Sequence, residues 1–132
     1  MGAWGYKTFD NDDASDWLYD LEETSDLSLI EETVKQGQGD YIEAYDGCNI
    51  LAAAEIIAAL KGQASNDLPE EAEAWIDQNK NLDIKNIEKQ VFEAVDRVLS
   101  DNSELKELWQ DSDDYEAWLE DVNKLKERLK AS

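Results

Sequence analysis

The chain has 132 residues, of which 33 are acidic and 12 are basic, so its formal net charge is −21. A chain of this length typically forms one domain, and we expect residues 1–132 to fold as a single unit. The sequence contains no histidine and one cysteine, Cys48. These absences exclude Ser-His-Asp and Cys-His catalysis, histidine-ligated zinc sites and an intrachain disulfide. Any catalysis would therefore use carboxylates, lysine or tyrosine, with or without a hard metal ion.

The excess of acidic residues also restricts the partners of the chain. A net charge of −21 repels nucleic acid phosphates and anionic membranes, whereas it attracts a basic protein. The sequence contains no apolar stretch of the roughly 18 residues that a membrane-spanning helix needs. The amino terminus also lacks the basic and apolar regions of a secretory signal. We therefore predict a cytoplasmic protein that binds neither nucleic acid nor membrane, and nothing in the sequence indicates a cofactor.

The charge is unevenly distributed along the chain. Residues 1–60 contain two of the 12 basic residues, Lys7 and Lys35, against 14 acidic residues, for a net charge of −12. Residues 61–132 contain the other ten basic residues against 19 acidic residues, for a net charge of −9. The amino-terminal half is therefore the better candidate for an acidic binding face.

The first two predicted helices span residues 12–23 and 27–36. Asn11 or Asp10 is placed to cap the first helix, and residues 24–26 form a break between the two. Apolar side chains recur at helical spacing in both segments, at Ala14, Trp17, Leu18, Leu21, Leu27, Ile30 and Val34. This spacing predicts two amphipathic helices with one buried face each.

The third predicted helix, residues 41–60, differs from the others because it is apolar on most of its circumference. From Ile50 to Leu60 every residue except Glu55 is apolar, and many are alanine. A helix of this kind is surrounded by protein, and its alanines let neighbouring helices approach closely. We predict that it is the central helix of the domain and that Gly62 ends it.

Four further helices complete the prediction, at residues 69–79, 84–100, 103–109 and 112–130. Pro69 suits the first turn of its helix because a proline there loses no hydrogen bond. The last helix ends in a basic cluster, Lys124, Lys126, Arg128 and Lys130. We attribute this cluster to the negative carboxyl end of the helix dipole, not to nucleic acid binding. The predicted fold is all-α, a single compact domain of about seven helices around the alanine-rich helix.

The amino-terminal segment, residues 1–17, combines large aromatic side chains with a group of acids. Trp4 and Phe9 would each be disfavoured by roughly 2–3 kcal/mol if left in water, so we expect both to pack onto the core. Asp12, Asp13 and Asp16 follow within one short stretch.

The three aspartates have two interpretations. In the first, Asn11 caps the helix, and Asp12 and Asp13 lie in its first turn, where negative charge is favoured. In the second, Asp12 and Asp16 lie one helical turn apart and contribute to a site for a hard metal ion. The spacing does not fit the known calcium-binding loop, because Ala14 stands where that loop needs an oxygen ligand. We therefore predict no defined metal site.

Glu55 is the second unusual residue, because an unpaired charge in a buried helix costs several kcal/mol. We expect its carboxylate to accept hydrogen bonds from backbone N–H groups or from a tryptophan indole in the amino-terminal segment. The alternative is a functional carboxylate that acts together with Asp12 or Asp16. The candidate binding residues are therefore Trp4, Asp12, Asp13, Asp16 and Glu55, and no residue is predicted to be catalytic.

These same residues resemble a known family. The opening residues 1–5, the run 9–14 and the pair Asp16 and Trp17 are similar to the start of bacterial proteins grouped as domain of unknown function 4259. The alanine-rich residues 52–62 are similar to a second signature of that family, and residues from 105 onwards are similar to its ending. Lys7 stands where glycine is commoner. The resemblance implies a stand-alone bacterial cytoplasmic protein and supplies no catalytic residues.

Three functions are compatible with these observations. The first hypothesis is a non-enzymatic interaction protein, an inhibitor or an immunity-type protein, whose acidic surface binds a basic protein. The second is a carboxylate-based metal-binding protein or hydrolase that uses the amino-terminal aspartates. The third is a DNA mimic, in which surface carboxylates imitate phosphates. Because the chain lacks common catalytic chemistry, we favour the first hypothesis.

Overall fold

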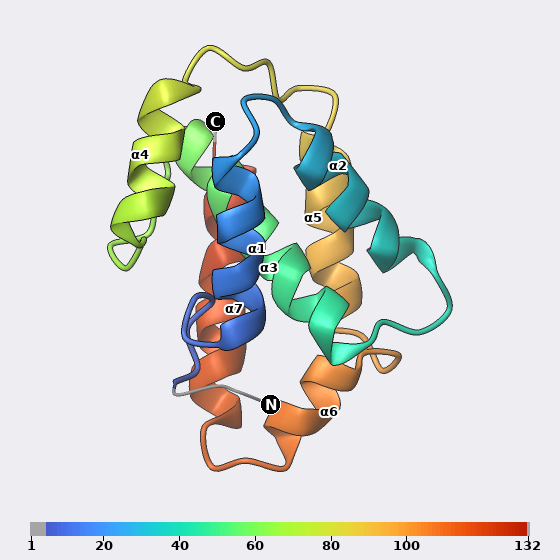
Figure 1. Ribbon diagram of the computed structural model, residues 1–132. Coiled ribbons are helices and arrows are strands. Elements are labelled where there is room, and N and C mark those ends of the chain that lie inside the picture. Colours follow the sequence, from blue (N-terminus) through green and yellow to red (C-terminus); the bar gives the residue numbers. More distant parts are fainter. Residues whose placement is uncertain (1–4, 132) are drawn as a thin grey trace.

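A computed structural model describes residues 5–131 (Figure 1). Within those residues the chain forms seven α-helices and one short 3₁₀ helix: α1 (Asp12–Glu22), α2 (Ser28–Lys35), η1 (Gln36–Gln38), α3 (Ala44–Leu60), α4 (Glu70–Gln78), α5 (Glu88–Val98), α6 (Glu104–Gln110) and α7 (Tyr115–Lys130). The described residues contain no strand and only one isolated bridge, between Ile42 and Ser103. The all-α prediction is therefore confirmed.

The helix boundaries agree with the predicted ones to within three residues, except at the start of α5. This helix begins at Glu88, four residues later than predicted. The Asp83 carboxylate accepts a hydrogen bond from the backbone N–H of Lys85 at 3.0 Å. The N–H of Ile87 donates to the carbonyl of Ile84, also at 3.0 Å. Because such a local aspartate bond competes with helix formation, residues 84–87 form turns before α5 begins.

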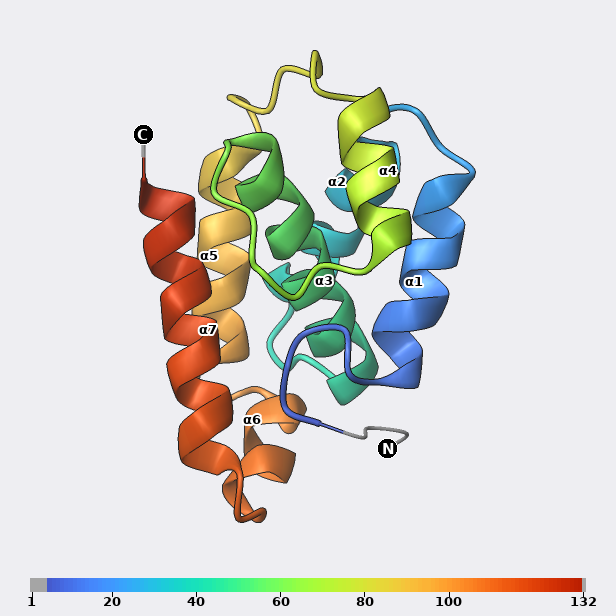
Figure 2. The same ribbon diagram turned by 90° about the vertical axis from the view of Figure 1, so that its left-hand side faces the viewer.

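Helix α3 lies at the centre of the molecule and contacts each of the other six α-helices (Figures 1 and 2). Every residue of α3 from Gly47 to Ala59 is buried. Gly47 allows α6 to approach closely, since a Cβ atom at this position would lie 3.1 Å from the Cβ atom of Leu105. The predicted central helix is thus confirmed, and its small residues permit the close packing around it.

Both ends of α3 are held by specific hydrogen bonds. At its start, the Glu104 carboxylate of α6 accepts a hydrogen bond from the N–H of Ala44 at 2.8 Å. At its end, Gly62 adopts a positive φ of 83°, and the N–H of Gln63 donates to the carbonyl of Ala58 at 2.9 Å. Glycine adopts this left-handed conformation without strain. Gly62 therefore ends the helix, as predicted.

The connections around α3 bring distant segments together. The connection from α3 to α4 runs back past α3, and the amino-terminal segment lies close to it (Figure 2). Phe9 is partly buried and packs against the core, which confirms the prediction for that residue. Trp4 lies outside the described residues. No helix among residues 5–131 has the length and apolar character needed to cross a membrane.

Candidate functional site

The amino-terminal aspartates lie at the start of α1. The Asn11 side chain accepts a hydrogen bond from the N–H of Ala14 at 2.8 Å and caps the helix. Asp12 and Asp13 occupy the first turn, where the helix dipole favours negative charge. Asp12 and Asp16 are exposed and Asp13 is half-buried. The capping interpretation of this segment is therefore confirmed.

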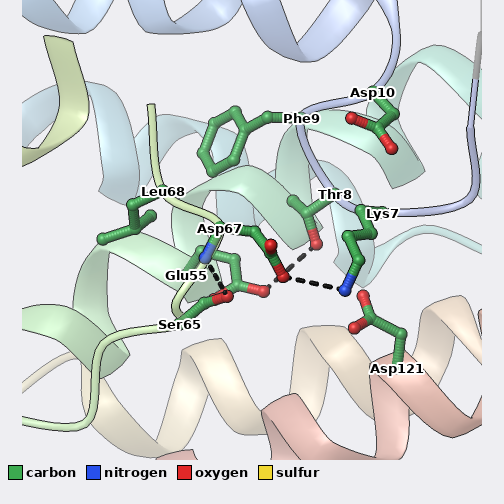
Figure 3. A pocket seen from close by; sticks show the side chains of 9 residues that line it. All are labelled: Lys7, Thr8, Phe9, Asp10, Glu55, Ser65, Asp67, Leu68 and Asp121. Atoms are coloured by element: carbon green, nitrogen blue, oxygen red, sulfur yellow. Dashed lines mark hydrogen bonds and ion pairs between the residues drawn. The ribbon is translucent and has the colours of Figure 1, made fainter. Parts of the chain in front are cut away.

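The turn before α1 directs Thr8 towards Glu55. The N–H of Asp10 donates to the carbonyl of Lys7 at 3.0 Å, and the Asn11 amide donates to the carbonyl of Thr8 at 3.1 Å. In this position the Thr8 hydroxyl donates to Oε2 of Glu55 at 3.2 Å (Figure 3). Asn11 thus has two roles, since it caps α1 and holds the turn that presents Thr8.

Glu55 is buried, with 3% of its surface exposed, and its main partner is Arg128 of α7. Arg128 Nη1 lies 2.8 Å from Oε1 of Glu55, and Nη2 lies 3.1 Å from Oε2. Nη1 also donates to the carbonyl of Gln63 at 3.2 Å. Backbone N–H groups or a tryptophan indole were the predicted partners, and among the described residues this prediction is wrong, because the amino-terminal segment supplies the Thr8 hydroxyl instead. The ion pair with Arg128 was not predicted.

A small pocket of about 20 Å³ lies beside Glu55, which is room for about one water molecule. Lys7 and Asp67 line it and form an ion pair, with Nζ 2.8 Å from Oδ2 (Figure 3). Asp121 of α7 also lines it. Burial, and then the negative charge of Glu55, raises the pKa of Asp121, although Lys7 and Arg128 oppose this shift.

We call Thr8, Glu55, Gln63 and Arg128 the Glu55 cluster. Its members come from the amino-terminal segment, α3, the connection after α3 and α7. The pocket beside it offers little room for a substrate. Both carboxylate oxygens of Glu55 already accept hydrogen bonds, and an arginine does not lose its proton in a protein. Asp12 and Asp16 do not line the pocket beside Glu55. Among residues 5–131, no group of three or more histidine, cysteine, aspartate or glutamate side chains is placed to hold a metal ion. The geometry supports a structural role for the Glu55 cluster.

Cys48 is buried in α3, with 2% of its surface exposed. Burial, together with the negative charge of Asp13, raises the pKa of its thiol to about 12. Because the thiolate is the reactive form, a thiol with this pKa is a poor nucleophile near neutral pH. The structure thus places Cys48 in the core as a small apolar residue.

A second, larger concavity lies between α1, α2 and the first turns of α3. Its volume is about 200 Å³, and it is lined by carboxylates from all three helices, Asp20, Glu32 and Asp46. We call it the acidic groove. Sequence reasoning did not identify these three residues as a group. No local sequence pattern connects them, because they lie on three different helices.

The comparisons with known proteins concern the family of the chain. No curated protein and no solved structure gave a significant match. The sequence model of one family, described as a domain of unknown function, matches residues 2–121. Because this match covers most of the chain, the protein belongs to the domain of unknown function family DUF4259.

Proposed function

We propose that this protein is a non-enzymatic interaction module of the bacterial cytoplasm that binds a basic protein, as an inhibitor or an immunity-type protein does. The observation that carries the proposal is the large excess of unpaired acid. Among the described residues, ion pairs within 4 Å involve eight of the 33 acidic side chains. The other 25 carboxylates have no cationic partner within that distance among residues 5–131.

The basic residues do not offset this excess on the surface. Eight of the 12 are already used in those ion pairs. Between Lys7 and Lys61 the only basic residue is Lys35. Among α1, α2 and α3, Lys35 is therefore the one basic residue, against nine acidic residues. The field of such a charge excess speeds the encounter with a basic partner and repels acidic ones.

Two features of the interior also support binding over catalysis. The one fully buried carboxylate, Glu55, is engaged by Thr8 and Arg128. The one thiol, Cys48, has a pKa of about 12 because it is buried. Both groups are buried, and the raised pKa of the Cys48 thiol keeps it from forming a nucleophilic thiolate near neutral pH.

The proposal is tested by capturing a partner on the immobilised full-length protein. Bacterial lysate is applied at about 0.1 M salt, where the Debye length is about 10 Å, and eluted at about 1 M salt, where it is about 3 Å. A resin carrying polyglutamate at matched charge density is the control. We expect a basic protein that binds this protein, not polyglutamate, and elutes with salt. The same protein, once purified, should bind in calorimetry. If nothing is retained beyond what polyglutamate retains, the proposal is wrong.

A further inference from the structure

The acidic groove lies where α1 and α2 pack against the amino-terminal part of α3 (Figure 1). Asp20 comes from α1, Glu32 from α2 and Asp46 from α3. Among residues 5–131, no lysine or arginine lines the groove, and none of the three carboxylates is in an ion pair. The three carboxylates therefore face one concavity without a counter-charge.

The groove also contains a buried polar group that lacks a partner. Asn49 lines the groove, and only 7% of its surface is exposed. Its Oδ1 atom accepts no hydrogen bond from any residue that the structure describes. Buried acceptors in folded proteins are nearly always satisfied. Asn49 thus points to a donor that the described part of the chain does not supply.

Two aromatic side chains complete the groove. Trp17 lines it, and its indole N–H is already bonded to the Thr33 hydroxyl at 2.8 Å. That donor is therefore not free for a ligand, and the ring is what Trp17 offers. Tyr45 also lines the groove and is 55% exposed. Aromatic faces attract cations, and the flat guanidinium group stacks on them well.

We propose that the acidic groove receives an arginine side chain of the basic partner, an inference that rests on the proposed function. Four of the polar side chains that line the groove offer acceptors to such a group: the carboxylates of Asp20, Glu32 and Asp46 and the amide oxygen of Asn49. A guanidinium group presents five N–H donors in one plane, whereas a lysine ammonium is a compact point charge. Arginine therefore matches several acceptors and an aromatic face at once.

The test uses the full-length, ¹⁵N-labelled protein and two capped peptides, hexa-arginine and hexa-lysine, at about 0.1 M salt. The indole N–H of Trp17 and the side-chain amide of Asn49 are the reporters. We expect hexa-arginine to shift both signals in a saturable way, and hexa-lysine to shift them less and to bind about tenfold more weakly. Equal shifts and equal affinity for both peptides would overturn the preference for arginine.

Two triple variants with the same change in net charge locate the binding. The groove variant carries Asp20→Asn, Glu32→Gln and Asp46→Asn. The control variant carries Asp111→Asn, Asp113→Asn and Glu127→Gln, at exposed positions outside the groove. We expect the groove variant to bind hexa-arginine about tenfold more weakly and the control variant to lose no more than about twofold.

If both variants bind hexa-arginine equally weakly, the affinity depends only on the net charge of the protein, and the groove inference is wrong. Circular dichroism checks that each variant is folded. If the groove variant does not fold, Glu32→Gln is compared with Glu127→Gln, with a loss of about threefold expected only for the first. If the groove variant captures the basic partner from lysate as well as the natural protein does, the groove inference is wrong and the proposed function still holds. Failure of the natural protein to capture any partner would refute the proposed function itself.

Discussion

Glu55 and Arg128 lie 73 residues apart in the chain, yet their side chains form a two-point ion pair, with nitrogen–oxygen distances of 2.8 and 3.1 Å. The pair joins the central helix α3 to the last helix α7. The same guanidinium binds the carbonyl of Gln63 in the connection after α3, and the same carboxylate accepts from Thr8 in the amino-terminal segment. One buried charge therefore connects four segments of the fold.

Removing Arg128 should be more damaging than removing both charges. Arg128→Met leaves the Glu55 carboxylate buried without its counter-charge, and we expect a loss of about 3–5 kcal/mol in the free energy of unfolding. The double variant Glu55→Gln with Arg128→Met should recover much of that loss, because no charge then remains buried. Urea unfolding of the natural protein, Glu55→Gln, Arg128→Met and the double variant measures the coupling. Additive effects of the two substitutions would show that the ion pair does not act as a unit.

The Thr8 hydroxyl should make a smaller contribution. Thr8→Val keeps the shape of the side chain and removes the hydrogen bond to Glu55, and we expect a loss of about 1.5 kcal/mol in the free energy of unfolding. Thr8→Ser is the matched control, because it keeps the hydroxyl and removes a methyl group. Equal stability of Thr8→Val and the natural protein in urea unfolding would contradict the assigned bond.

The pH dependence of stability should differ in sign between two aspartates. Burial raises the pKa of Asp121 above its ordinary value of 3.8, so the folded state holds that proton more tightly than the unfolded chain. Stability from this group is therefore present below pH 3.8 and lost as the pH rises through the raised pKa. We expect the stability of Asp121→Asn, relative to the natural protein, to increase from about pH 3 to pH 7.

Asp26 provides the opposite case and serves as the comparison. Hydrogen bonds from the Ser28 hydroxyl and then from the Ser28 backbone N–H lower the pKa of Asp26 below 3.8. Its carboxylate stabilises the folded state above pH 3.8, and this contribution is lost as the pH falls through the lowered pKa. The stability of Asp26→Asn, relative to the natural protein, should therefore decrease as the pH rises. Thermal unfolding across the pH range measures both differences, and the same trend in both variants would contradict the assignment.

Cys48 should resist alkylation while the protein is folded. With a pKa of about 12, only about one thiol in ten thousand is ionised at about pH 8, and the side chain is buried. We expect iodoacetamide to label the native protein far more slowly than the protein unfolded in guanidinium chloride. Mass spectrometry follows the added mass over time. Rapid labelling of the native protein would show that Cys48 is accessible, contrary to its position in α3.

The local features of this protein follow from its sequence because they depend on neighbours in the chain. The apolar spacing predicted the helices, the apolar circumference of residues 50–60 predicted the buried α3, and Asn11 and Gly62 marked helix ends. Each of these features involves residues within about one or two helical turns, where helical period and capping chemistry are enough. Local chemistry also explained where α5 differs, since the Asp83 side chain competes with the first turn of the helix.

Only the tertiary structure decided which distant side chains meet. A buried Glu55 implied a partner, but its position in the chain did not single out Arg128 among 12 basic residues. Likewise, Asp20, Glu32 and Asp46 come together in one groove only because α1 and α2 both pack against α3. Sequence by itself therefore determined the helices, the central element and the excess of negative charge. Packing decided how charges pair and where they gather, because those contacts depend on how the helices are placed around α3.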